Sequence, residues 1–287
     1  MEKYIHPTDS RIKEFIELLG LHDKSLEVVI HELFKWFDQN VSYTRLNAPL
    51  YPLQRSDLDV LEMRAGTCGD FSNLIVSVLT ALGYEAKYAY LKEDCYGNPQ
   101  DHICVAVRDG EKWKLVDATL PYRKWNGFDC QHREYEVLGA NDFLERMKKE
   151  EAYWIEYASS MGNPEFAGLY YAPWIHEHII RQTEDTLVSV FYLLVLNKVE
   201  DYQLYVNLFV YTKDTACSPI VCRMQNGKEY YSFSIKVAQN IWDYEQYSQE
   251  YEVENIPEEY RSDYLTELMD CIQKTIKNIE RVIRIEK

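Results

Sequence analysis

The sequence is poor in glycine and proline, with 11 and 9 among its 287 residues. This scarcity excludes collagen-like and low-complexity chains. Long hydrophobic runs are also lacking, since the longest, residues 187–196, is about half of the ~20 residues that a membrane-spanning helix requires. We therefore interpret this run as a buried strand and expect no membrane partner.

Basic residues are fewer than acidic ones. The chain has 31 Lys and Arg against 47 Asp and Glu, which gives a formal net charge of −16. Such a chain repels phosphate backbones, so we expect no nucleic-acid partner. Most of the negative charge lies after residue 127, and we interpret it as a well-solvated surface.

An export signal is missing from the N-terminal residues, which show no apolar stretch followed by a small-residue cleavage site. The cysteines are odd in number and stand at positions 68, 95, 104, 130, 217, 222 and 271. An odd count without an export signal favours reduced thiols over a disulfide framework. We therefore expect a cytoplasmic protein.

Apolar periodicity predicts an α+β protein. Helices are predicted over residues 10–19, 25–37, 57–63, 68–82 and 142–158, and from about 258 onward; strands over 84–91, 102–108, 112–117, 187–196, 204–212, 220–224 and 230–237. The order of these elements suggests three parts. Residues 1–125 form a core with N-terminal helices, 126–175 a connecting helical and loop segment, and 176–287 a β-rich acidic extension that ends in a long helix.

The segment Gly66-Thr67-Cys68-Gly69-Asp70 is the most informative part of the chain. It places Cys68 in the first turn of an apolar helix, where the N-terminal amides favour a thiolate. The same amides can donate hydrogen bonds to an oxyanion. The flanking glycines leave room for a substrate to approach the backbone. Cys68 is therefore a candidate nucleophile.

A predicted hairpin supplies partners for that thiol. His102 opens one strand, Asp117 closes the next, and Asp109-Gly110 is a strong hairpin signal between them. Pairing about a turn centred on these two residues puts Asp117 directly opposite His102. An imidazole there can act as general base and acid, and a carboxylate can hold its tautomer. Alternation places His102 on the same face as Cys104 and Ala106.

These residues resemble the transglutaminase-like superfamily, which has a papain-like α+β fold with a Cys-His-Asp triad in this chain order. The resemblance spans about residues 40–120 and rests on four stretches, Gly66–Leu74, Leu82–Ala86, His102 with its valine-rich strand, and Trp113–Thr119. It implies that the helix carrying Cys68 packs on an antiparallel sheet. It also implies that Cys68 is the nucleophile, His102 the base and Asp117 the orienting carboxylate.

The chain departs from the family in three ways. Cys104 stands where the family often has Trp, which changes the wall of the cleft. No cysteine precedes Cys68, so the zinc-binding pairs of peptide N-glycanases are missing. An acidic calcium loop like that of animal transglutaminases is not recognisable. These departures argue against both specialised subclasses.

Other clusters of ligand types are weak metal signals. His176 and His178 with Cys217 and Cys222 do not have zinc-finger spacing, and Cys130 with His132 is no better. We therefore expect no metal and no cofactor.

The predicted activity is thiolate attack on a protein or peptide amide, which gives a thioester acyl-enzyme that water or an amine resolves. Tyr43 and Gln54 are candidates for a second oxyanion donor. Two alternatives stay open: a silent scaffold that keeps the fold, and a β-rich partner-binding half regulated by the core. The sequence does not determine the substrate, the acyl acceptor or the oligomeric state.

Overall fold

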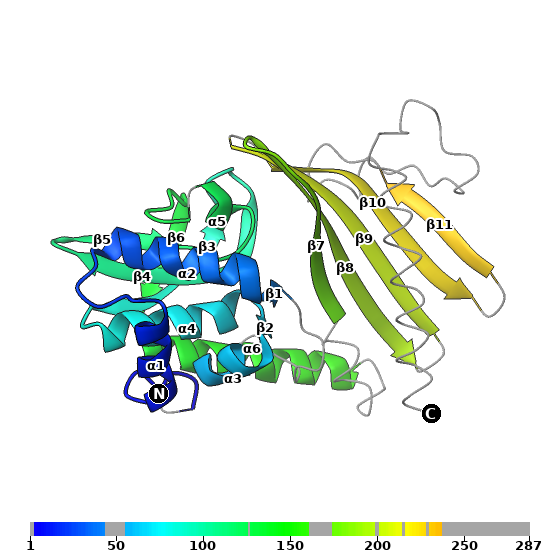
Figure 1. The fold of residues 1–287 in the computed structure, drawn as a ribbon. Helices are drawn as coiled ribbons and strands as arrows, with labels where there is room; N and C mark the ends of the chain where they lie inside the picture. Colours follow the sequence, from blue (N-terminus) through cyan, green and yellow to red (C-terminus); the bar gives the residue numbers. More distant parts are fainter. Residues whose placement is uncertain are drawn as a thin grey trace. The chain divides into compact units, whose positions relative to one another are not determined.

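The chain forms two compact units, Met1–Tyr157 and Ala158–Lys287, in the computed structural model (Figure 1). The structure describes residues 3–43, 55–125, 127–160, 174–198, 201–213, 216–227 and 230–236. None of the helices within these ranges is long and apolar enough to cross a membrane.

The first unit combines helices with a four-stranded antiparallel sheet, as the predicted α+β class requires. Its helices are α1 (Ser10–Leu18), α2 (Leu26–Asn40), α3 (Asp57–Met63), α4 (Cys68–Ala81), α5 (Tyr122–Trp125) and α6 (Ala140–Ser160). Its main sheet has the order β5-β4-β3-β6, formed by β3 (Ala86–Glu93), β4 (Pro99–Asp109), β5 (Lys112–Val116) and β6 (Glu134–Leu138). A two-residue parallel pair, β1 (Ser42–Tyr43) with β2 (Ala65–Gly66), lies just before α4.

Strand β6 extends this unit beyond residue 125, where the sequence analysis placed its end. Residues 134–138 pair with β3 in an antiparallel register, Tyr88 opposite Leu138. The sequence pattern predicted a connecting helical and loop segment here, because the alternation in Glu-Tyr-Glu-Val-Leu is only a few residues long and its first three residues are exposed. The segment after residue 125 is therefore part of the sheet and not only a connection.

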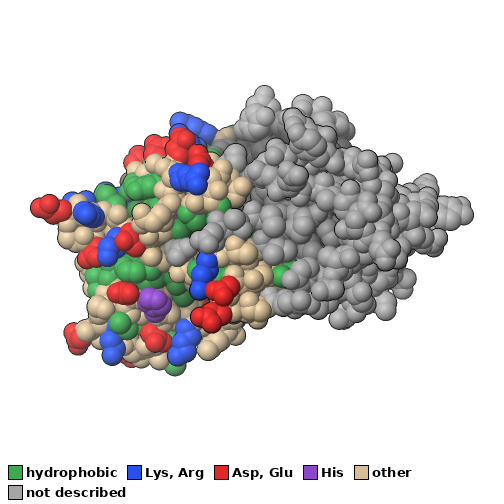
Figure 2. Space-filling model, turned by 90° about the horizontal axis from the view of Figure 1, so that it is seen from above, with side chains coloured by type: hydrophobic (Ala, Val, Ile, Leu, Met, Phe, Trp, Pro, Cys, Tyr) green, Lys and Arg blue, Asp and Glu red, His purple; other side chains and the backbone are tan. Residues whose placement is uncertain are grey.

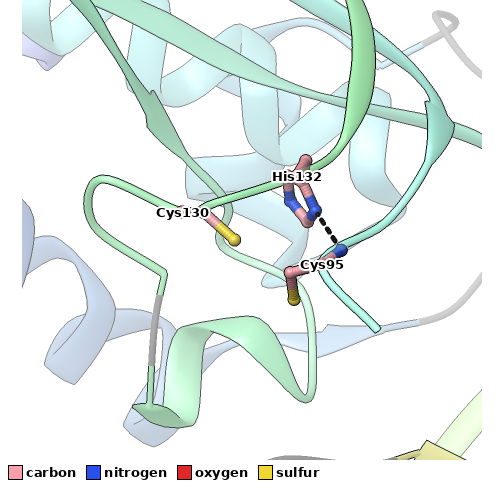
Figure 3. Close-up of side chains that lie close together, drawn as sticks. All are labelled: Cys95, Cys130 and His132. Atoms are coloured by element: carbon pink, nitrogen blue, oxygen red, sulfur yellow. Dashed lines mark hydrogen bonds between the residues drawn. The ribbon is translucent and has the colours of Figure 1, made fainter. Parts of the chain in front are cut away.

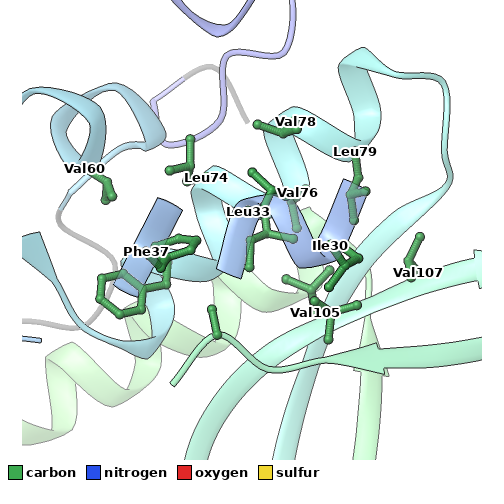
Figure 4. Close-up of a cluster of buried hydrophobic side chains, with 14 of the residues drawn as sticks. Ile30, Leu33, Phe37, Val60, Leu74, Val76, Val78, Leu79, Val105 and Val107 are labelled. Atoms are coloured by element: carbon green, nitrogen blue, oxygen red, sulfur yellow. The ribbon is translucent and has the colours of Figure 1, made fainter. Parts of the chain in front are cut away.

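The main core lies between the helices and one face of the sheet. Side chains of α2 and α4 pack against the odd-numbered residues of β4, Ile103, Val105 and Val107 (Figure 4). The even-numbered residues Cys104 and Ala106 lie in a second buried cluster on the opposite face. The predicted alternation along β4 is therefore confirmed, and α4 packs on the sheet as the resemblance implied.

The register of the β4–β5 hairpin differs from the predicted one. Asp109 pairs with Lys112 and Val105 with Val116, so the two loop residues are Gly110 and Glu111. Gly110 adopts a positive φ of 60°, which glycine accommodates without strain. The prediction that Asp117 lies directly opposite His102 is wrong, because the turn is centred one residue later than Asp109-Gly110.

The second unit contains a five-stranded antiparallel sheet of order β11-β10-β9-β8-β7. The strands are β7 (Trp174–Gln182), β8 (Thr186–Lys198), β9 (Asp201–Thr212), β10 (Ala216–Gly227) and β11 (Tyr230–Lys236). The four predicted strands are confirmed, and β7 is an additional one. The predicted turn at Asn226-Gly227 is displaced, since Gly227 pairs with Tyr230. The predicted closing helix lies outside the described residues.

Candidate active site

Cys68 is the first residue of α4, as the sequence predicted. Thr67 caps the helix, and the Asp70 carboxylate accepts hydrogen bonds from the Thr67 amide (2.8 Å) and hydroxyl (3.3 Å). This pairing satisfies the Thr67 amide and leaves the amides of Cys68 and Gly69 in the same first turn. Cys68 is half-buried, so its thiol lies at the edge of the core.

Two contacts fix the start of α4. A Cβ atom on Gly66 would lie 2.8 Å from the Cβ of Asp70 and 3.1 Å from a ring carbon of Phe71, so only glycine fits there. Gly66 thus serves close packing, and its role in substrate access stays a prediction. The Ser72 hydroxyl donates to the Cys68 carbonyl at 2.8 Å and lies 3.5 Å from the Ile103 carbonyl, which links the first turn of α4 to β4.

His102 and Asp117 are in direct contact. The Nε2 atom of His102 lies 2.8 Å from Oδ2 of Asp117, and both side chains are buried. Hydrogen bonding also joins His102 to the Cys68 side chain. The structure therefore brings the three residues singled out from the sequence into one cluster.

Asp117 accepts more hydrogen bonds than the sequence indicated. Its Oδ1 accepts from the Thr119 amide (2.9 Å) and from the Thr119 hydroxyl (2.7 Å). Its Oδ2 is shared between His102 and a second imidazole, that of His132, whose Nε2 lies 3.2 Å away. His132 escaped the sequence analysis as a partner of Asp117, because it follows an irregular segment whose path no periodicity predicts.

The electrostatics favour a charged pair. Burial alone would lower the pKa of His102, but the negative charges of Asp117 and Cys68, with hydrogen bonds to both, raise it well above its ordinary value. Burial alone would raise the pKa of the Asp117 carboxyl, but the charge of His102 and hydrogen bonds from His102 and His132 hold it below its ordinary value. An ionised Asp117 next to a protonated His102 is the arrangement that stabilises an imidazolium.

Of the two candidates for a second oxyanion donor, Tyr43 and Gln54, only Tyr43 lies among the described residues. Tyr43 lies in β1 and pairs with Gly66, two residues before Cys68. Its ring contacts Phe71 edge-on, with the centroids 5.8 Å apart. Gln54 lies outside the described residues. Tyr43 is thus near the start of α4, and its role stays a prediction.

A groove elsewhere on the first unit contains none of the three candidate catalytic residues. A groove along α2 and the segment 123–128 is lined by residues such as His31, Phe34 and Arg123, and by none of Cys68, His102 and Asp117. Acidic and basic side chains are interspersed over the described face shown in Figure 2.

The metal-ligand sets considered from the sequence also separate. His176 and His178 belong to β7, whereas Cys217 and Cys222 belong to β10, and two strands lie between them. At about 4.8 Å per strand the two pairs are roughly 14 Å apart, so they cannot share one ion. Cys130 and His132 instead meet Cys95, whose loop is distant in sequence (Figure 3).

A family comparison agrees with this geometry. The sequence model of the Transglutaminase-like superfamily core matches residues 20–118. Residues 20–118 are therefore similar to the transglutaminase-like superfamily core. The matched range includes Cys68, His102 and Asp117, but it ends before Thr119 and His132. The contacts of Asp117 with Thr119 and His132 thus lie partly beyond the matched range.

Comparison with solved structures finds a protein from Cytophaga hutchinsonii described as a "Putative Cysteine Protease". The two chains are 23% identical, with a TM-score of 0.34, and the similarity covers 48% of either chain. The chain thus spans about half the length of that protein. No curated protein matches the sequence.

Proposed function

We propose that the transglutaminase-like domain is a thiol enzyme that acts on protein or peptide amides. The observation that carries this proposal is the continuous hydrogen-bonded series Cys68–His102–Asp117 at the N-terminus of α4. A nucleophile next to a base that a third group orients is the arrangement that nucleophilic catalysis needs.

In the first half of the reaction, the Cys68 thiolate attacks the amide carbonyl carbon. The negative charge moves to the carbonyl oxygen, where the amides of Cys68 and Gly69 in the first turn of α4 can donate to it. His102 then gives its proton to the leaving nitrogen, the C–N bond breaks, and a thioester on Cys68 remains. Asp117 keeps the imidazole in place and stabilises its charged form.

In the second half, the acyl acceptor attacks the thioester. His102, now neutral, takes a proton from water or from an amine as the new bond to the acyl carbon forms. Collapse of the intermediate breaks the C–S bond and returns the thiolate. Water as acceptor gives a protease or deamidase, whereas an amine gives a crosslinking enzyme.

The decisive experiment labels the proposed nucleophile covalently. The full chain is incubated with a library of electrophilic peptides, and adducts are located by intact-mass and peptide mass spectrometry. We expect one adduct on Cys68, its loss in Cys68→Ser, and its retention in Cys217→Ser, a control in the second unit. Absence of any Cys68 adduct, with a folded protein, would leave the alternative of a scaffold that keeps the fold without the activity.

The acyl acceptor is a separate question. A glutamine-containing peptide is offered with and without a fluorescent primary amine, and ammonia release is measured beside amine incorporation. Ammonia without incorporation indicates hydrolysis, and incorporation indicates transfer. Cleavage of the peptide backbone with neither indicates a protease.

A further inference from the structure

A second cluster of reactive side chains lies beside the proposed triad, and the mechanism does not use it. Cys95 belongs to the turn between β3 and β4, whereas Cys130 and His132 belong to the segment that leads into β6 (Figure 3). The thiols of Cys95 and Cys130 lie close together where these two segments meet. The sulfur atoms and a ring nitrogen of His132 all lie within 4.8 Å of one another.

We propose that Cys95, Cys130 and His132 bind one zinc ion through two sulfur atoms and the imidazole Nδ1. Zinc takes thiolate sulfur at about 2.3 Å and imidazole nitrogen at about 2.0–2.1 Å in tetrahedral geometry, so its ligand atoms stand roughly 3.7 Å apart. The three ligand atoms lie within 4.8 Å of one another, so a contraction of about 1 Å at most brings them to this spacing. Sulfur and nitrogen ligands favour zinc over magnesium and calcium, which take oxygen.

The protonation of His132 suits a metal ligand. Its Nδ1 accepts a hydrogen bond from the Cys95 amide at 3.2 Å, so this nitrogen carries a lone pair directed toward the cysteine loop. The proton therefore resides on Nε2, which lies 3.2 Å from Asp117 Oδ2. A metal-ligating histidine usually donates its other N–H to a carboxylate in this way. Zinc would replace the Cys95 amide at Nδ1.

The surroundings hold both ligand-bearing segments in place. The Cys130 amide donates to the Leu115 carbonyl at 3.1 Å, and the Arg133 amide donates to the Glu93 carbonyl at 3.2 Å. In the other loop, the Asp94 carboxylate accepts from the backbone amide of Asn98 at 2.8 Å. Ligands fixed in advance lose little conformational freedom when the ion binds.

The proposed zinc site is open to solvent on one side only, at Cys95. Cys130 and His132 are 4% and 5% exposed, whereas Cys95 is half-buried. An ion can therefore enter past Cys95, and a water molecule can complete the tetrahedron there. Two thiolates also balance the charge of the zinc ion, so the bound site would be neutral.

A disulfide between Cys95 and Cys130 is the competing chemistry. It would not use His132, whose Nδ1 accepts from the Cys95 backbone amide and which has a ring nitrogen within 4.8 Å of both sulfur atoms. The geometry thus favours an ion, and the disulfide becomes an outcome of the test.

The test measures metal and not activity. Untagged full chain is purified with reductant, loaded with zinc, passed through gel filtration and analysed by elemental mass spectrometry. We expect one zinc per chain, with loss of binding in Cys95→Ala and Cys130→Ser, and with unchanged binding in Cys222→Ser. Asp117→Asn should bind roughly 10- to 100-fold more weakly, because it removes the carboxylate that supports His132.

Cobalt substitution of the wild-type protein provides a second readout that depends on no variant. A sulfur-to-cobalt charge-transfer band and tetrahedral visible bands are expected, and Cys95→Ala should reduce the charge-transfer band. Absence of stoichiometric metal, unchanged binding in Cys95→Ala, or a Cys95–Cys130 disulfide in the isolated protein would overturn the proposal. None of these results bears on the Cys68 adduct, so the proposed function is judged separately.

Discussion

Asp117 reaches His102 diagonally across the β4–β5 ladder. The last paired residues of the hairpin are Val105 and Val116, so the same register would bring Asp117 opposite Cys104. His102 lies two residues farther along the same face, a diagonal separation that long side chains can span. The 2.8 Å contact between Nε2 and Oδ2 shows that these two side chains span it.

Replacing Asp117 by Asn should impair the enzyme without abolishing it. The amide keeps the shape but loses the charge that stabilises the imidazolium. The same change in a serine triad costs about 10⁴ in turnover. We expect a smaller loss here, on the order of 10²-fold, because the helix terminus already favours the thiolate.

The measurement is turnover of a peptide that acylates Cys68, with thermal melting in parallel. Cys68→Ala should be inactive. Asp109→Asn, at the exposed end of the same hairpin, should match wild type. Full activity in Asp117→Asn would show that another group orients His102.

Alkylation of Cys68 should proceed at a pH where an ordinary thiol is protonated. The pKa of His102 is raised above its ordinary value, so the imidazolium persists through neutral pH and stabilises the thiolate next to it. His102 also contacts Oδ2 of Asp117, and the same oxygen contacts Nε2 of His132. We expect the iodoacetamide rate at Cys68 to change only a few-fold between pH 6.5 and 8.5, resolved by peptide mass spectrometry. A rate that follows a free thiol, with a pKa near 8.5, would contradict the ion pair.

Thr119 is expected to position Asp117. Its hydroxyl donates to Oδ1 at 2.7 Å and lies 3.3 Å from His102 Nε2. Thr119→Val removes this hydroxyl at nearly constant volume, and should steepen the pH dependence of Cys68 alkylation while the fold persists. Thr119→Ser restores the hydroxyl and should restore the wild-type profile. Identical profiles for the two variants would mean that Thr119 has only a packing role.

Gly66→Ala should destabilise the first unit. The new methyl group would approach the Cβ of Asp70 to 2.8 Å, closer than real Cβ atoms come, so one of the two segments must shift. Overpacking of this kind costs about 1–3 kcal/mol of unfolding free energy. Gly139→Ala is the matched control, because its Cβ meets only the terminal oxygen of Asp142, at 3.3 Å. Urea denaturation of both variants checks this, and equal midpoints would refute the packing role of Gly66.

The parts of the fold that follow local patterns were predictable. The apolar periodicity of residues 68–82 identified α4, and strict alternation separated the two faces of β4. The Asp109-Gly110 signal located the hairpin but not its centre. Moving the centre by one residue moves every pairing by two, which keeps the same faces together. The contact of His102 with Asp117 therefore survives the error in register.

The parts that depend on tertiary contacts were not predictable. Strand β6 is only five residues long and its first three residues are exposed, so its short alternation is a weak signal. The Cys130-x-His132 spacing was visible in the sequence, but Cys95 joins it only because two loops meet beside the sheet. Its distance along the chain leaves no local signal. The Cys130-x-His132 spacing alone therefore did not predict a three-residue cluster, because Cys95 is brought to it only by the fold.

The hydrogen bond from the Asp117 amide to the Gly127 carbonyl, 2.7 Å long, sets the shortest fragment in which the site can form. A fragment that ends at Thr119 would contain Cys68, His102 and Asp117, but it would lack Gly127, which accepts from the Asp117 amide, and His132, which contacts the Asp117 carboxylate. The strand that returns to pair with β3 would be lost as well. Truncations that stop near residue 120 should therefore lose reactivity at Cys68 although all three side chains are present. Fragments for crystallisation or assay are best ended after α6.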